Sequence, residues 1–298
     1  MKKIILILTL IIFTGCTLDS KTPATNIENN ESEQAQTQQD EPKQSYADIS
    51  LQAFAEKNFN GRDLELGRVL ADNEFYTRYY ITYKSADLDI SGIMNVPKSE
   101  GPHPVLILNH GYIDPAVYTN GRGLKREQDY FAREGYIVIH PDYRNHAQSS
   151  KVDNIETDLR FGYTEDVVNA VYAVKESDLE FFNKEKIGML GHSMGGGITQ
   201  NILVALPDLI DAAVLYAPVS ADYRDNFDKW GRTNESRNSV LTEYGDFNEN
   251  PEFWKNISPI NFVDKIQTPI LIQHGTADES TPIAWSEKFY NELNSKSI

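Results

Sequence analysis

Residues 191–195 (GHSMG) have the composition and spacing that a nucleophilic serine requires. They follow the apolar run 187–190 and precede a segment with helical periodicity, so the G-x-S-x-G pattern lies at a strand-to-helix turn. So tight a turn excludes bulky flanking residues, and it lifts the serine oxygen above the sheet edge with the next backbone N–H on the same side. We therefore predict that Ser193 is a nucleophile and that the Met194 N–H stabilises an oxyanion. The alternative is a glycine-rich helix start with an idle serine.

A second polar segment, residues 109–112 (NHGY), follows the apolar run 105–108. An oxyanion hole needs a second donor at this place, and we predict that it is the backbone N–H of Tyr112. His110 is a candidate base by residue type. A histidine at a buried strand end is more often a hydrogen-bonded structural residue, and we expect that role here.

Asp278 ends the segment 273–278 (QHGTAD), which follows the apolar run 270–272. An aspartate that comes after the nucleophile in the chain, at the C-terminal end of a later strand, has the position of the acid that orients a catalytic histidine. An exposed loop aspartate is otherwise simply solvated. We predict that Asp278 is the acid.

Strands that alternate with helices must bring these residues together. Residues 75–83 and 88–96 read as an antiparallel pair. Continuous apolarity in the later runs is typical of strands buried on both faces. These runs are residues 105–108, 137–139, 187–190, 212–215 and 270–272, and the segments with helical periodicity are 125–134, 165–175, 195–206 and 282–293. The pattern predicts an α/β fold with a mostly parallel sheet and helices on both faces.

Three segments carry a resemblance to a known family: residues 130–144, the turn 191–196 (GHSMGG), and residues 258–275. Together they resemble the catalytic domain of the prolyl oligopeptidase (S9) family within the α/β-hydrolases. The resemblance covers the chain from about residue 75 to the end. It implies a serine hydrolase with Ser193 as nucleophile and Asp278 as triad acid, which cleaves peptide bonds through an acyl-enzyme. A carboxylesterase of the same fold uses the same residues and is the alternative.

The histidine of the triad has no match in this sequence. The family places it beyond one more helix and one more strand after the acid, yet no histidine follows His274. Geometry argues against substitution by His110, His146, His192 or His274. We therefore expect a domain that lacks its last strand, either because the reading frame is truncated or because the chain is an inactive surface lipoprotein. Losing one triad member lowers the rate by about 10⁴- to 10⁶-fold.

Residues 221–263 are rich in aromatic side chains and lie between the fourth and fifth apolar runs. We predict that they form a cap over the strand ends, with Trp230 and Trp254 in the walls of a substrate pocket. The alternative is that these rings pack helices onto the sheet.

The N-terminus has the features of an export signal. Two lysines precede ten uncharged residues, a stretch too short to span a bilayer, and residues 13–16 (FTGC) resemble the lipobox of bacterial lipoproteins. We predict a signal peptide over residues 1–15, lipidation at Cys16, a flexible polar tether over 16–48 and a catalytic domain over 49–298. The predicted location is extracytoplasmic, anchored to a bacterial membrane. A plain secretory signal with an incidental cysteine is the alternative.

Composition limits the partners. The 298 residues include 40% hydrophobic residues and carry a net charge of −16, so the chain is globular and its average face repels nucleic acids and anionic membrane surfaces. One cysteine allows no internal disulfide. No clustered ligand spacing indicates a metal or a cofactor. We expect a small peptide or ester as substrate and a membrane contact through the lipid alone.

Overall fold

The computed structural model describes residues 49–153, 155, 157–231 and 235–296. The predictions for the signal peptide, for Cys16 and for the tether fall on residues 1–48, outside this part of the chain.

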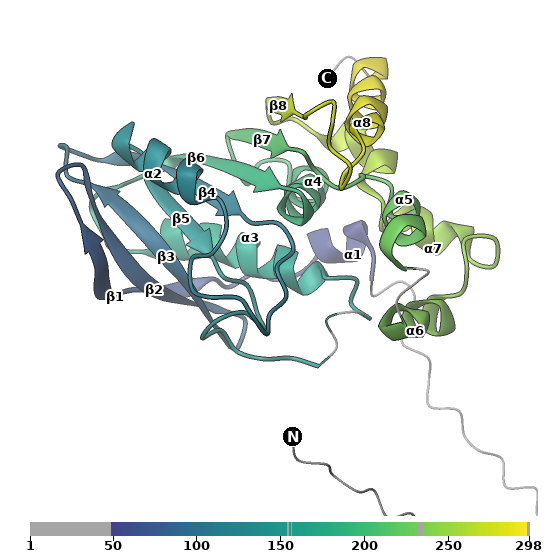
Figure 1. Cartoon of the computed structure of the whole chain (residues 1–298), viewed down its shortest axis with the longest axis horizontal. Coiled ribbons are helices and arrows are strands. Elements are labelled where there is room, and N and C mark those ends of the chain that lie inside the picture. Colours follow the sequence, from purple (N-terminus) through teal and green to yellow (C-terminus); the bar gives the residue numbers. More distant parts are fainter. Residues whose placement is uncertain (1–48, 154, 156, 232–234, 297–298) are drawn as a thin grey trace, which may run out of the picture. The chain divides into compact units, whose positions relative to one another are not determined.

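A single eight-stranded sheet forms the centre of the described fold (Figure 1). Its strand order is β1-β2-β3-β5-β4-β6-β7-β8. The strands are β1 (Arg62–Asp72), β2 (Tyr76–Ser85), β3 (Leu88–Pro97), β4 (His103–Asn109), β5 (Ile137–Pro141), β6 (Phe182–His192), β7 (Ala212–Tyr216) and β8 (Ile270–Gln273).

The predicted direction of the strands is confirmed. β2 and β3 form the expected antiparallel pair, and each of the five later strands is parallel to its neighbours among them. Parallel strands need crossover connections, and the helices between them supply these. The C-terminal ends of β4, β6, β7 and β8 therefore lie at one edge of the sheet, where the candidate residues follow.

Helices cover both faces, as predicted. On one face α2 packs against β3 and β5, with Leu106, Val138 and Ala132 in a small core. On the other face α1, α3 and α4 pack over a larger core, to which α8 adds Phe289 and Leu293. The helices are α1 (Leu51–Ala55), α2 (Lys125–Arg133), α3 (Phe161–Glu176), α4 (Met194–Ala205), α5 (Tyr223–Asn226), α6 (Glu235–Tyr244), α7 (Pro251–Asn256) and α8 (Ile283–Ser295), with a π-helix η2 (Phe227–Gly231) and a 3₁₀-helix η3 (Pro259–Lys265). Within the described ranges, no helix has both the length and the apolarity needed to cross a bilayer.

Two features of the sheet differ from the sequence-based expectation. Strand β1 was not predicted, because it is an edge strand whose side chains are mostly exposed and mix charged with apolar residues. Strand β8 was expected to be buried on both faces, but one of its faces is exposed. Ile270 and Ile272 face the larger core, whereas Leu271 points to the α2 side and is 60% exposed. The reason is that α2 lies over β3 and β5, at a distance from the β8 edge.

The aromatic segment 221–263 is helical and contains α5, η2, α6, α7 and η3. Trp254 is only 4% exposed, its ring packs against Phe227 and Phe247, and its Nε1–H donates to Gly245 O at 3.1 Å. This placement favours the alternative that the Trp254 ring packs helices, because a buried ring with a satisfied N–H stabilises the helices around it. Trp230 is half-buried and meets Trp285 edge to face, with ring centroids 5.4 Å apart.

Replacing the buried indole should therefore affect stability. We expect Trp254→Ala to lower the free energy of unfolding by about 3 to 5 kcal/mol, because it leaves a cavity and an unpaired carbonyl. Urea unfolding measures this value. Trp230→Ala is the matched control, and a smaller loss is expected because this ring is only half-buried. Equal losses for both variants would contradict the assignment.

Candidate active site

Ser193 lies between β6 and α4 in an unusual backbone conformation, with φ 53° and ψ −118°. Left-handed φ values are costly for a residue with a side chain, so surrounding contacts must hold this one. The Ser193 N–H donates to Tyr216 O at 3.1 Å, and Ser193 O accepts from Gly196 N at 2.9 Å and from Val219 N at 3.1 Å. The turn is thus fixed by β7 and by the loop that follows it.

The flanking glycines are required by space, as predicted. A Cβ at Gly191 would overlap with Gly195 O and with the Thr199 hydroxyl. A Cβ at Gly195 would overlap with Asn109 O, at the C-terminal end of β4. Helix α4 therefore starts in direct contact with two strand ends, which only residues without side chains allow.

The loop after β4 reaches the candidate nucleophile. A Cβ at Gly111 would lie 3.1 Å from Ser193 Cβ, so the backbone of this loop passes directly beside Ser193. Tyr112 follows, and its side chain is 56% exposed. The structure thus brings Ser193, Met194 and Tyr112 together at the ends of β4 and β6, as the sequence predicted.

A buried carboxylate holds the rest of this loop. Asp142, fully buried after β5, accepts hydrogen bonds from Tyr118 Oη at 2.8 Å, Asn120 Nδ2 at 2.7 Å and Gly121 N at 2.8 Å. Ser91 Oγ of β3 donates to it at 2.6 Å. A buried charge is stable only when it is hydrogen-bonded in this way, and the same bonds fix residues 118–121 to the sheet. No pattern in the sequence indicates this role of Asp142.

Asp278 lies in the loop after β8, the second strand from β6 along the sheet. Its Oδ1 accepts from Ser280 N and Thr281 N, both at 2.9 Å, and its Oδ2 lies 3.0 Å from Thr281 Oγ1. These bonds, led by that from the Thr281 N–H, lower the pKa of Asp278 below its usual value of 3.8. The carboxylate is therefore ionised at neutral pH.

Two residues that sequence reasoning missed connect Asp278 to the rest of the site. Thr281 Oγ1 also lies 3.2 Å from Ala217 O, directly after β7. His274 binds both Thr281 O, at 2.6 Å, and Ser286 Oγ of α8, at 2.7 Å. Because a carbonyl only accepts, His274 Nε2 donates to Thr281 O. The D-x-x-T spacing is a sequence signal for the first contact.

The histidines of this chain have other contacts. His110 lies beside Gly111 O and Asp142 O, and His146 beside Arg144 O and Ile113 O. His192 packs against the Tyr216 ring, with centroids 5.2 Å apart. Among the residues that the structure describes, Ser193 Oγ forms no hydrogen bond to any of the six histidines.

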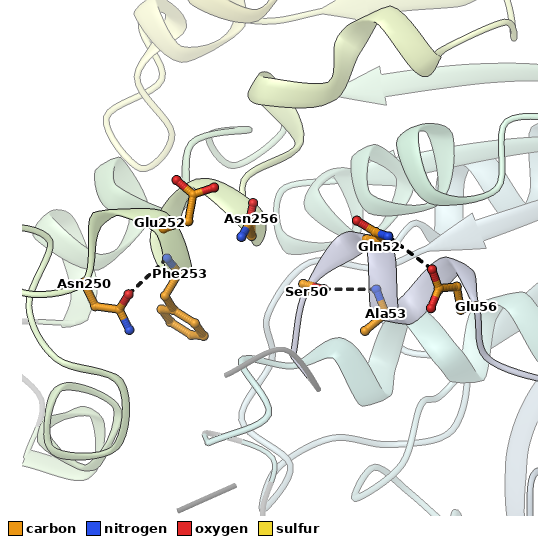
Figure 2. A pocket seen from close by; sticks show the side chains of 8 residues that line it. All are labelled: Ser50, Gln52, Ala53, Glu56, Asn250, Glu252, Phe253 and Asn256. Carbon is orange, nitrogen blue, oxygen red and sulfur yellow. Dashed lines mark hydrogen bonds between the residues drawn. The ribbon is translucent and has the colours of Figure 1, made fainter. Parts of the chain in front are cut away.

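A cavity of about 430 Å³ lies elsewhere, between α1 and α7. Figure 2 shows residues of α1 on one side, and α7 with its N-cap residue on the other. None of the predicted site residues lines it. Its lining consists of Ser50, Gln52, Ala53, Glu56, Asn250, Glu252, Phe253 and Asn256.

The sheet order, the helices on both faces and the strained Ser193 turn define the α/β-hydrolase fold. Solved structures agree. Acetyl xylan esterase 1 from Thermoanaerobacterium superposes with a TM-score of 0.60 at 20% identity, over 83% of this chain and 82% of the esterase. Acylaminoacyl peptidase from Pyrococcus horikoshii superposes with a TM-score of 0.57 at 22% identity, over 75% of this chain and 36% of that protein. At these identities the likeness concerns the fold.

Residues 122–298 match the family model of the prolyl oligopeptidase family, and the chain belongs to this family of hydrolases. Among curated relatives, the acylamino-acid-releasing enzyme of Rattus norvegicus is 21% identical over 228 residues, which cover 72% of this chain and 30% of the rat protein. An uncharacterized peptidase of Bacillus subtilis is 25% identical over 206 residues, 66% of this chain and 29% of that protein. The chain thus spans less than a third of the length of these relatives.

The complete burial of His140 in β5 assigns this histidine a structural role, and the assignment predicts a pH dependence of stability. Burial lowers the pKa of His140 to about 3, and neither ring nitrogen has a partner among the described residues. The unfolded chain binds a proton below about pH 6.5 that the folded chain does not bind, so stability falls as the pH decreases toward 3. We expect His140→Leu to reduce the loss of unfolding free energy between pH 7 and pH 5 by about 2 kcal/mol. Urea unfolding at the two pH values measures this, and an unchanged loss would contradict the assignment.

Proposed function

We propose that this chain is a serine hydrolase of the peptidase type, which cleaves peptide bonds through an acyl-enzyme on Ser193. The observation that carries the proposal is the strained Ser193 turn, with the backbone of Gly111 against its Cβ. A strained backbone that several hydrogen bonds maintain is typical of a functional position. The ionised carboxylate of Asp278 at the same edge of the sheet supports it.

The reaction would follow the order that these groups allow. Ser193 Oγ attacks the substrate carbonyl, and the N–H groups of Met194 and Tyr112 stabilise the tetrahedral oxyanion. Expulsion of the leaving group produces the acyl-enzyme, which water then hydrolyses. Asp278 would orient the base that takes the serine proton and returns it to the leaving group.

Base catalysis is the part of this scheme that the described histidines do not provide, because none of them forms a hydrogen bond to Ser193 Oγ in the part of the chain that the structure describes. The same observation favours a second candidate function, a surface protein that binds a ligand at this site without turnover. A test must therefore measure the reactivity of Ser193 independently of the base that activates it. Added imidazole, which can act as a base from solution, makes this measurement possible.

We expect a fluorophosphonate probe to label the wild-type chain slowly, and faster with increasing imidazole. Ser193→Ala should abolish labelling with and without imidazole, as measured by mass spectrometry of the intact protein. Ser295→Ala, at an exposed position on α8, is the matched control and should be labelled like the wild type. A folded wild type that stays unlabelled at every imidazole concentration would rule out the nucleophile and favour the binding protein.

The substrate is tested with the same variants. Parallel assays with a short peptide p-nitroanilide and with p-nitrophenyl acetate, both with added imidazole, compare amide with ester cleavage. The proposal requires Ser193-dependent release from the anilide. Release from the ester alone would identify the carboxylesterase alternative.

For the N-terminus we propose a lipid anchor at Cys16, supported by the lipobox-like segment 13–16 and by the polar segment that follows. The full chain, expressed in a bacterium that processes lipoproteins, should partition into the detergent phase of Triton X-114. Cys16→Ser should move it to the aqueous phase, because the thiol carries the lipid. Wild-type protein in the aqueous phase would favour the plain secretory signal.

A further inference from the structure

Arg160, the residue directly before α3, contacts both residues that carry the proposed oxyanion donors. Its guanidinium carbon lies 4.9 Å from the centroid of the Tyr112 ring, and its Nη1 lies 3.4 Å from Met194 Sδ. Tyr112 follows β4 and Met194 follows β6, so one cationic side chain spans the ends of two strands.

A strained turn places this side chain. Leu159 and Arg160 have φ values of 52° and 64°, in the left-handed region. Asp158 holds the turn, because its Oδ1 accepts from Arg160 N at 2.8 Å and its Oδ2 accepts from Gly162 N at 3.1 Å. A left-handed pair of residues with side chains persists only when such contacts over-determine it, and these conformations concentrate at functional sites.

The same turn is bonded to the segment 221–263. Tyr223 Oη donates to Leu159 O at 3.1 Å, and Tyr244 Oη donates to Thr157 O at 2.7 Å. The turn is thus fixed from α3 on one side and from α5 and α6 on the other, and Arg160 extends from it to Tyr112 and to Met194, the residue after Ser193.

We propose that Arg160 is a positioning residue for the oxyanion hole, an inference that rests on the proposed function of Ser193. Two backbone N–H groups stabilise an oxyanion only if both converge on the same oxygen. The guanidinium stacks on Tyr112, half of whose surface is exposed, and contacts the buried Met194 thioether, and so sets the distance between the two residues. Arginine suits this role because its planar group stays charged and stacks on aromatic rings.

Phenylboronic acid tests this role without requiring a base. Ser193 Oγ forms a bond to boron, the boron keeps its two hydroxyls and becomes tetrahedral, and the serine proton passes to solvent. The negatively charged adduct resembles the tetrahedral intermediate, so its stability reports on the oxyanion hole. At pH 7, ¹¹B NMR detects tetrahedral boron, and calorimetric titration measures the dissociation constant.

We expect Arg160→Met to raise this dissociation constant by about 10- to 100-fold, and Arg160→Lys to raise it less, because lysine keeps the charge and loses the planar stack. Tyr112→Leu should cause a similar loss. Combining it with Arg160→Lys should add little, because both act on one contact. Arg68→Met is the matched control, since Arg68 forms a stack of the same 4.9 Å on Tyr80 at the β1 edge, and it should bind like the wild type.

The outcomes separate this inference from the proposed function. A wild type without Ser193-dependent tetrahedral boron would overturn the nucleophile itself. A wild type that binds, with Arg160→Met and Tyr112→Leu within twofold of it, would overturn the positioning role alone. Fully additive losses in the double variant would also overturn it, since a residue that acts through Tyr112 cannot add to the loss of that ring. Melting temperatures of all variants exclude unfolding as the cause of weaker binding. If Arg160→Met does not fold, Tyr112→Leu still tests the contact, because it leaves the strained turn at Leu159 and Arg160 unchanged.

Discussion

The backbone of Ser193 is the constraint on which the rest of this structure depends. A φ of 53° with a side chain present is unfavourable, so the turn exists only because its surroundings leave no alternative. Tyr216 O and Val219 N hold the peptide groups of Ser193 from the side of β7, while Gly191 and Gly195 remove the side chains that would push α4 away. Strand β6, helix α4 and the end of β7 therefore cannot move independently of the serine.

The sheet order extends this constraint to the rest of the site. β4 and β7 flank β6, and β8 follows β7, so the loops that carry Tyr112 and Asp278 come to the same edge as the serine. Each loop is held in place by its own hydrogen bonds. The buried carboxylate of Asp142 fixes the first, and Thr281 with His274 fixes the second. The site is thus assembled from separate loops that share a rigid base, as is usual where α/β sheets bind ligands.

Sequence patterns predicted the parts of the fold that depend on the local periodicity and apolarity of the chain. The runs that became β4 to β8, the helices α2, α3, α4 and α8, and the serine turn all follow from periodicity, apolarity or glycine spacing. Edge strand β1 has no such signal, because mostly exposed side chains need not be apolar. The burial of Leu271 was misjudged because it depends on which helix covers the strand, a property of packing. The stack of Arg160 on Tyr112 joins two loops that are distant in the sequence, and neither residue type indicates it.

The contacts around Ser193 separate two tasks that serine hydrolases combine. In the proposed site, oxyanion stabilisation would depend on the backbone N–H groups of Tyr112 and Met194, which follow β4 and β6, and on Arg160 in the turn before α3. Proton transfer depends on a base that Asp278 would orient. His274 Nε2 lies 3.8 Å from Asp278 Oδ2 but is hydrogen-bonded to Thr281 O, and among the described residues no histidine is hydrogen-bonded to Ser193 Oγ. Electrostatic preorganisation lowers the energy of a tetrahedral species whether or not a base is present. In the proposed site, affinity for such a species is therefore a property of the strand ends, and turnover is a property of the base, so the two must be measured separately.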